Sequence, residues 1–281
     1  MLADLVRILV ALGLPAVMLA QGSTVEGRQL LYLVQRPGLL ARSLLAAVVA
    51  VPLIALLVGW LLRPEPTVRV GLAVLAACPV APLMIIKVRK ATGGADYVAA
   101  LHLTLAVLSI VTTPLALALL SRALGFQAEI RPLAVAGQVA RSVLLPFGLG
   151  VAARTWTPDF AARVRRPVAV IGGSALLVAI VILLAATWRL LLAMDLRSYL
   201  AMGVMLLAAL AVGELLGGGS PTQRAALALE SAARNPGLAL LIATLNFDRR
   251  RSLAVLLPYL IVSVTLVSVY TRWRVRRLAA A

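Results

Sequence analysis

The sequence has few charged and aromatic residues, one cysteine and one histidine. Charged residues make up 13% of its 281 residues, and Phe, Trp and Tyr together make up 5%. A soluble globular domain carries about 25% charged residues, so this composition excludes an ordinary soluble protein. Because Cys78 has no partner cysteine in the chain, a disulfide scaffold is excluded as well.

Hydrophobic residues fill 62% of the chain, and its mean hydropathy is +1.03. A helix needs about 20 residues to cross the hydrocarbon core of a bilayer. Nine apolar runs of about this length predict an all-α polytopic membrane protein with nine transmembrane helices. The predicted runs are 3–21, 38–62, 69–91, 97–121, 132–153, 167–188, 196–217, 222–246 and 252–271.

Basic residues outnumber acidic ones by 27 to 10, which gives a formal net charge of +17. They lie mostly at the ends of the apolar runs and form no basic face with interleaved aromatic residues. We therefore interpret them as topology signals and expect no nucleic-acid partner. An outside N-terminus places most of the loop Lys and Arg on the inner side. The charge bias thus predicts a multi-pass protein of a bacterial inner membrane, with the N-terminus outside and the C-terminus inside.

Two of the runs are poorly suited to continuous helices. The run 69–91 contains Pro79 and Pro82, and the run 222–246 contains an Asn-Pro-Gly sequence at 235–237. A proline removes a backbone donor and clashes with the preceding turn. Two interrupted runs in corresponding halves predict an inverted-repeat transporter in which two discontinuous helices cross near the midplane. The alternative is that these prolines only kink their helices.

The stretch 230–247 resembles the Glu-x-x-x-Gln-Asn-x-x-Leu-Ala signature of the bile acid:sodium symporter family. The Cys-Pro pair at 78–79, a glycine-containing loop at 92–94 and the Thr-Pro pair at 113–114 fall where that family has its first crossing helix and the helix after it. The resemblance covers essentially the whole chain. It implies an importer of organic anions such as bile acids, other steroid conjugates, or pantoate-like or keto-acid carboxylates.

The resemblance also implies a panel domain beside a core domain within a single transmembrane unit, 1–281. We expect panel helices at about 1–62 and 167–195. We expect core helices at about 63–153 and 196–281.

Members of this family couple transport to sodium, but the residues at the implied sodium positions do not fit a sodium ion. Glu230 keeps the acidic position, and Thr104 keeps a hydroxyl. The other implied side-chain positions carry Ala47, Met84, Ile85, Ala100 and Arg234. Because hard cations need about five or six oxygen ligands, we assign no metal ligand in this chain.

The remaining intramembrane charges are candidates for a coupling and charge site. A lone carboxylate at the bilayer centre costs about 2.5–3.5 kcal/mol on insertion scales, so Glu230 needs a partner or a function. Arg234 lies four residues on, and it either neutralises Glu230 or supplies a fixed cation where relatives bind sodium. Lys87 is a second candidate cation, unless its ammonium snorkels to the interface. Together the three carry a net charge of +1, which suits an anion without a coupling ion.

Asn235 matches the family's asparagine beside the second crossing point, so the resemblance implies that it binds substrate. Pro82 and Thr104 are further substrate-binding candidates. A helix start offers unpaired N–H donors and a partial positive charge, which suit an anion. The alternative is that Asn235 only caps the downstream helix. We interpret His102 as a packed hydrogen-bonding residue, with proton coupling as the alternative.

These features predict a secondary transporter of a small organic anion, a carboxylate, in which fixed cations replace sodium coupling. The alternatives are a sodium- or proton-coupled symporter of the same fold and a non-transporting, anion-binding membrane sensor. The sequence contains no nucleophile–base pair, metal cluster or phosphate loop, so we expect neither an enzyme nor a cofactor. The expected partners are the organic anion, the lipid bilayer and a sodium ion or proton.

Overall fold

The computed structural model describes residues 2–25, 29, 31–79, 95–125, 132–246 and 249–279. In these ranges the chain is all-helical and contains no strand, which agrees with the predicted all-α class. Two short π-helices interrupt α-helices, and each lies just before a proline. The polar backbone is thus satisfied mainly within helices, as a membrane environment requires.

Six helices of the described residues are long and apolar enough to cross a membrane. They are α1 (Leu2–Gly22), α3–η1–α4 (Pro37–Leu44, Leu45–Ala50, Val51–Leu61), α7 (Ala95–Leu124), α8–η2–α9 (Pro132–Val139, Ala140–Leu144, Leu145–Trp156), α10 (Pro158–Ala193) and α11 (Leu196–Leu216). Each contains one of the predicted runs.

The other three predicted runs have different outcomes. The run 69–91 continues from α5 (Pro66–Ala77) into residues outside the described ranges. The run 222–246 is divided into α12 (Pro221–Ala232) and α13 (Pro236–Asn246), and 252–271 lies within α14 (Arg249–Ala279). The count of nine spans therefore stays a prediction.

Helix α10 begins earlier than the sequence suggested. The predicted run begins at residue 167, but the helix starts at Pro158 and continues through Pro167. A proline in the first turn loses no hydrogen bond, because that N–H has no partner within the helix. Pro158 therefore begins the helix here.

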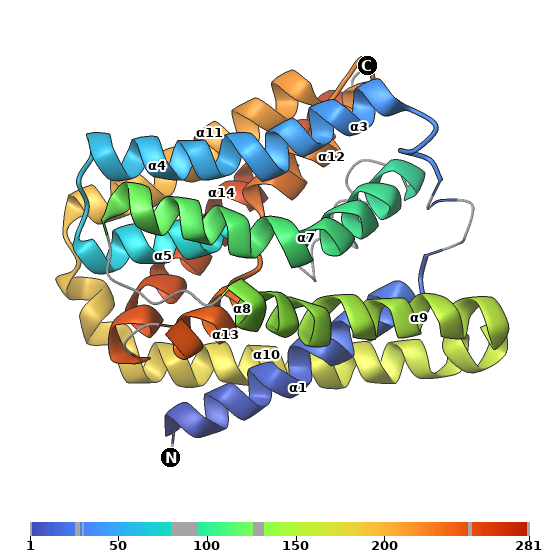
Figure 1. Cartoon of the computed structure of the whole chain (residues 1–281), viewed down its shortest axis with the longest axis horizontal. Helices are drawn as coiled ribbons and strands as arrows, with labels where there is room; N and C mark the ends of the chain where they lie inside the picture. Colours follow the sequence, from blue (N-terminus) through green and yellow to red (C-terminus); the bar gives the residue numbers. More distant parts are fainter. Residues whose placement is uncertain are drawn as a thin grey trace.

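The helices pack in two groups (Figure 1). In the lower part of the view α1 packs against α9 and α10. In the upper part α11 packs against α4, α12 and α14, and α5 packs against α4 and α7. Of the helices in the predicted panel ranges, 1–62 and 167–195, α1 and α10 lie in the lower group, whereas α4 packs in the upper group. Helix α9, which falls in the predicted core range, packs in the lower group.

Glycines bring α1 and α9 into direct backbone contact. A Cβ atom added to Gly22 would lie 2.0 Å from the carbonyl oxygen of Phe147. One added to Gly150 would lie 2.1 Å from the carbonyl oxygen of Leu19. Small residues of this kind allow close helix packing in membranes. No larger residue fits at either position unless the helices separate.

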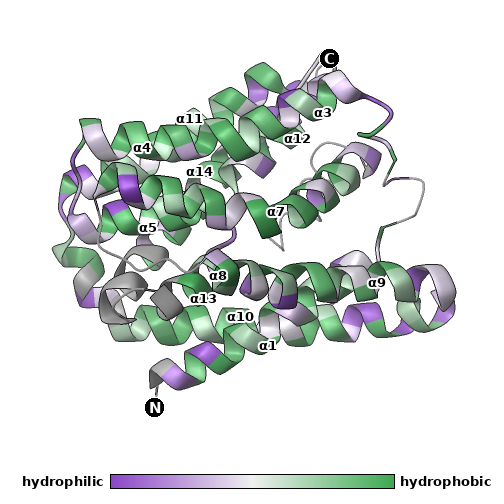
Figure 2. Ribbon diagram, in the orientation of Figure 1, coloured by the Kyte–Doolittle hydropathy of each residue, from purple (hydrophilic) through white to green (hydrophobic). Residues whose placement is uncertain are grey.

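Hydrophobic residues make up most of the length of the helices (Figure 2). Large hydrophobic side chains are exposed along several helices, including Leu53, Leu57, Leu115, Leu177 and Val181. In water such continuous apolar surface would drive association, whereas in a bilayer it contacts lipid tails. The exposed surface therefore agrees with an integral membrane protein.

Candidate functional site

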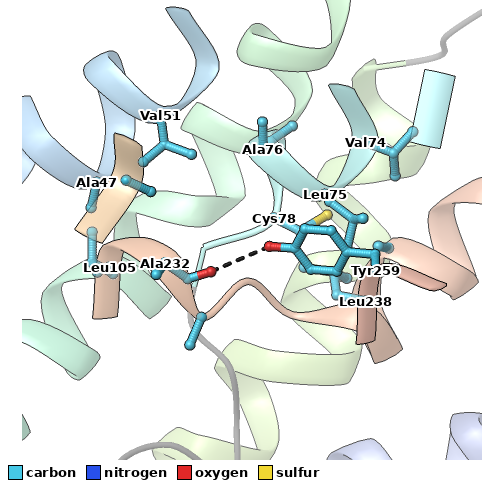
Figure 3. Close-up of a cluster of buried hydrophobic side chains, with 14 of the residues drawn as sticks. Ala47, Val51, Val74, Leu75, Ala76, Cys78, Leu105, Ala232, Leu238 and Tyr259 are labelled. Carbon is cyan, nitrogen blue, oxygen red and sulfur yellow. Dashed lines mark hydrogen bonds between the residues drawn. The ribbon is translucent and has the colours of Figure 1, made fainter. Parts of the chain in front are cut away.

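The predicted interruption of 222–246 is present, and it lies between α12 and α13. Helix α12 ends at Ala232, and α13 begins at Pro236. Because Pro236 has no N–H, the carbonyl of Ala232 has no helical donor. The hydroxyl of Tyr259, from α14, donates to this carbonyl at 3.2 Å (Figure 3). The free carbonyl at the end of α12 is therefore paired by a tertiary contact.

A second interruption follows α5, which ends at Ala77 with Cys78 as its C-cap. Pro79 removes the N–H that the carbonyl of Leu75 would accept in a continued helix. This carbonyl accepts the N–H of Cys78 at 3.0 Å and Nε of Arg234 at 3.2 Å. The free carbonyl at the end of α5 is thus paired in part by the side chain of Arg234, which comes from the interruption between α12 and α13.

From residue 80 onward, the predicted run 69–91 lies outside the part of the chain that the structure describes. Pro82 and Lys87, two of the candidate site residues, lie in the segment 80–94, outside the described residues. Met84 and Ile85, which fall at implied sodium positions, lie there too. The roles proposed for Pro82 and Lys87 therefore stay predictions.

The two interrupted segments contact each other directly. The backbone N–H of Asn235 donates to the carbonyl oxygen of Cys78 at 3.0 Å. Both residues are fully buried. The break before α13 therefore supplies an N–H donor and the break after α5 supplies a carbonyl acceptor, and the two pair with each other, as irregular backbone inside a membrane protein requires.

A third free carbonyl comes from the π-helix η1. In a π-helix each N–H pairs with the carbonyl five residues back, and Val51 pairs with Ala46 in this way. The next residue, Pro52, has no N–H to pair with the carbonyl of Ala47. Nη1 of Arg234 donates to the carbonyl oxygen of Ala47 at 3.2 Å. The guanidinium thus replaces a donor that the proline removes.

Arg234 completes its hydrogen bonds with two more carbonyls. Nη2 donates to the carbonyl of Ala76, and Nη1 also donates to that of Ser231 at 3.5 Å. The whole residue is only 3% exposed. Its cation therefore lies among four carbonyl oxygens from η1, α5 and α12. The C-terminal carbonyls of a helix carry a partial negative charge, which favours a cation at this position.

Glu230 does not pair with Arg234, although their separation of four residues suggested that it would. Pairing with Arg234 required both to lie on one continuous helix, but α12 ends at Ala232 and turns Arg234 away. Within the described part of the chain, Arg234 forms no ion pair with Glu230. Oε2 of Glu230 instead lies 3.7 Å from Nδ1 of His102, on α7. Sequence analysis missed this pair because it joins two separate helices.

Asn235 caps α13, as one of the two interpretations of this residue expected. Its Oδ1 accepts the N–H of Leu238 at 3.0 Å, while its Nδ2 has no partner among the described residues. Thr104 donates its hydroxyl to the carbonyl of Ala100 in its own helix at 2.7 Å. Contact of Asn235 or Thr104 with a substrate stays a prediction.

The helical fold, its apolar exterior and the buried, interrupted segments are typical of a membrane transporter. A model of the sodium bile acid symporter family matches residues 11–194, which is more than half of the chain. The chain therefore belongs to this family, whose members are transporters rather than enzymes. A search of curated proteins found no match. The matched range ends before Glu230, so the geometry around Arg234 is an independent observation.

Proposed function

We propose that this protein is a secondary transporter of a small organic anion, a carboxylate, and that Arg234 takes the place of a coupling sodium ion. One observation carries this proposal: the buried guanidinium of Arg234 donates to backbone carbonyls of α5 and α12, where these helices are interrupted, and of the π-helix η1. Family membership supports the transport of an organic solute.

The chemistry of these carbonyls explains why a cation belongs there. Free carbonyl oxygens at helix ends suit a hard cation such as sodium, and they suit guanidinium N–H donors equally well. A guanidinium stays charged and remains attached to its helix, whereas a sodium ion can leave on either side of the membrane. Arg234 would therefore stabilise the interruptions permanently but could not transmit a sodium gradient.

The start of α13 is our candidate for the anion site. Asn235 caps this helix through Oδ1, which leaves the Nδ2 amide as a buried donor without a partner in the described residues. A buried donor without a partner is costly, and a carboxylate oxygen would relieve that cost. The N-terminal dipole of α13 and the charge of Arg234 both favour a negative ligand. Pro82, Thr104 and Lys87 remain candidates for completing this site.

Transport by this protein would also require the architecture predicted from the sequence. We propose nine transmembrane helices, an outside N-terminus and an inside C-terminus. We further propose that the panel contains α1 and α10, and that the interrupted segments cross near the midplane within the core. Access would alternate as the panel and the core move relative to each other.

Uptake by proteoliposomes tests this proposal. Radiolabelled pantoate, 2-oxoisovalerate and cholate would be offered in sodium buffer and in choline buffer, after a thermal-shift screen of organic acids in the purified protein. We expect saturable uptake of at least one acid at the same rate in both buffers. A steep dependence on sodium in the native protein would contradict the role given to Arg234.

Two variants test whether Arg234 makes uptake independent of sodium. Arg234→Gln restores the residue type that the family carries at this position, and a sodium dependence found only in this variant would support the proposal strongly. Arg189→Gln, which removes an exposed arginine of α10, is the control for a changed charge and should behave like the native protein. An acid that binds but is never taken up would favour the membrane sensor instead.

A further inference from the structure

His102 and Glu230 form a buried pair that the proposed role of Arg234 does not use. Nδ1 of His102 lies 3.7 Å from Oε2 of Glu230, and both side chains are fully buried. Neither imidazole nitrogen and neither carboxylate oxygen has a hydrogen-bond partner among the described residues. Four polar atoms are therefore buried in one place without partners.

The pair lies between the two groups of helices. Glu230 belongs to α12, which packs in the upper group. His102 belongs to α7, which packs against α4 and α5 of that group and also against α8, which continues into α9 of the lower group. The ring of His102 contacts the ring of Phe147 on α9, in the lower group, with centroids 6.0 Å apart. A displacement of one group against the other would therefore change the surroundings of this imidazole.

Few other titratable or charged groups face the pair. On α7, the hydroxyl of Tyr97 shares a hydrogen bond of 2.9 Å with Ser43 of α3. On α14, Tyr259 donates to the end of α12. Arg234 is the charged neighbour with which Glu230 interacts electrostatically, although the two form no ion pair.

Two further groups complete the surroundings. On α5, Cys78 is buried beside Arg234. On α11, Glu214 lies at the far end of its helix, where Arg274 and Tyr270 pair with it. Among the described residues, η1 adds no titratable group. Within the part of the chain that the structure describes, the charge state of this region is therefore set by Arg234 and by the protons on His102 and Glu230.

A proton accounts for the unpartnered atoms of the pair. An ionised carboxylate beside a neutral imidazole leaves one buried charge without a hydrogen bond, which is unfavourable in a low dielectric. Adding one proton gives either imidazolium with carboxylate or imidazole with carboxylic acid, and both pairs are neutral. Histidine is the side chain best suited to gain and lose a proton at physiological pH.

We propose that the His102–Glu230 pair binds one proton and that this proton is the coupling ion of the transporter, an inference that rests on the proposed function. Without the proton, the negative charge of the pair balances Arg234. With the proton bound, the pair is neutral, and the positive charge of Arg234 is available to an anion. Proton and anion therefore raise each other's affinity by the same factor, as linkage requires.

The proton site can be tested without knowing the substrate. His102 is the only histidine of the chain, so ¹⁵N-histidine labelling with a histidine-free purification tag gives a single imidazole to follow by NMR. Between about pH 5 and 9 its signals should change in the native protein. In Glu230→Gln the change should occur at a different pH, whereas in Ser109→Ala, a control on the same helix, it should not move. Identical signals in native protein and Glu230→Gln at every pH would overturn the proposal.

Coupling is tested by uptake from choline buffer in liposomes with an acidic outside. One proton per monovalent anion allows an accumulation of about tenfold for each pH unit of gradient. We expect the native protein to approach this ratio for pantoate, after subtraction of uptake by protein-free liposomes. Glu230→Gln carries no negative charge whatever the state of His102, so it should bind pantoate without first binding a proton and should equilibrate it without accumulation. His102→Gln serves as a second variant if Glu230→Gln does not fold.

The possible failures are distinguishable. Uptake that accumulates pantoate equally with and without the pH gradient would overturn proton coupling while leaving anion transport intact. Uptake driven by sodium would overturn both this inference and the role of Arg234. If pantoate, 2-oxoisovalerate and cholate are all neither bound nor taken up at any pH, the proposed function fails, and the NMR titration still decides the proton site.

Discussion

The backbone N–H of Asn235 donates to the carbonyl oxygen of Cys78, and this bond joins two interrupted helices that lie far apart in the sequence. Each residue is next to a proline, which removes a donor from its own segment. The two prolines would leave buried carbonyls unpaired in an isolated helix, at a cost of about 1–3 kcal/mol each. Arg234 and Tyr259 pair the carbonyls of Leu75 and Ala232 that lose their donors, and the contact between the segments pairs the carbonyl of Cys78 in addition.

Replacing Arg234 should destabilise the protein. Arg234→Gln removes donors from the carbonyls of Ala47, Leu75 and Ala76, and one amide cannot replace all of them. We expect a loss of about 2–4 kcal/mol of unfolding free energy, seen as a lower Tm in detergent. Arg234→Lys keeps the charge but not the planar fork of donors, so it should be intermediate. An unchanged Tm for Arg234→Gln would show that these bonds contribute little.

Tyr259→Phe should weaken the contact between the end of α12 and α14. The substitution removes only the hydroxyl that donates to the carbonyl of Ala232 and keeps the ring packing. A loss of about 1–2 kcal/mol is expected, because the carbonyl stays buried without a donor. Thr265→Val is the control, since the hydroxyl of Thr265 is exposed and bonds only within its own helix. Equal Tm values for the two variants would contradict this role of Tyr259.

Asn235→Ser should separate the capping role from the binding role. Serine caps helices about as well as asparagine, so the Tm should change little. The variant lacks the Nδ2 donor, which is free in the described structure. Anion affinity should therefore fall by about 1.5–3 kcal/mol, or roughly tenfold to more than a hundredfold, in a binding titration. Unchanged affinity would reduce Asn235 to a cap.

Gly150→Ala should weaken the packing of α1 on α9. Its added methyl group would lie 2.1 Å from the carbonyl oxygen of Leu19, so the helices must separate. We expect a loss of about 1–3 kcal/mol, as for other overpacked contacts. Gly148→Ala is a matched control on the same helix, because nothing lies within 4 Å of the added methyl group. If both variants unfold at the same temperature, the close approach does not limit stability.

The sequence predicted the interruptions because they follow from local chemistry. Pro79 and Pro236 cannot donate a hydrogen bond, whatever surrounds them, so helix breaks at these residues could be expected. The apolar runs likewise predicted six membrane-crossing helices, five of them to within a few residues at both ends. The start of α10 was misplaced because Pro158 can either end a helix or begin one.

The partners of the site residues could not be predicted from one sequence. The spacing of Glu230 and Arg234 suggested a pair only while the helix between them was taken as continuous. Once the helix ends at Ala232, the direction of Arg234 depends on which carbonyls other elements bring to it. Pro52 is a local signal for one of them, since a π-helix before a proline leaves a free carbonyl. The approach of His102 to Glu230 has no local signal at all.

The glycine contacts between α1 and α9 limit how this protein can change shape. Where backbone touches backbone there are no side-chain rotamers, so neither helix can adjust to the other by small local rearrangements. We expect α1 and α9 to keep their relative position in every conformation and to move, if at all, as a rigid body. Sliding is then confined to boundaries filled by side chains, such as the contact of His102 with Phe147. Spin labels on α1 and α9 would accordingly keep one distance throughout a transport cycle.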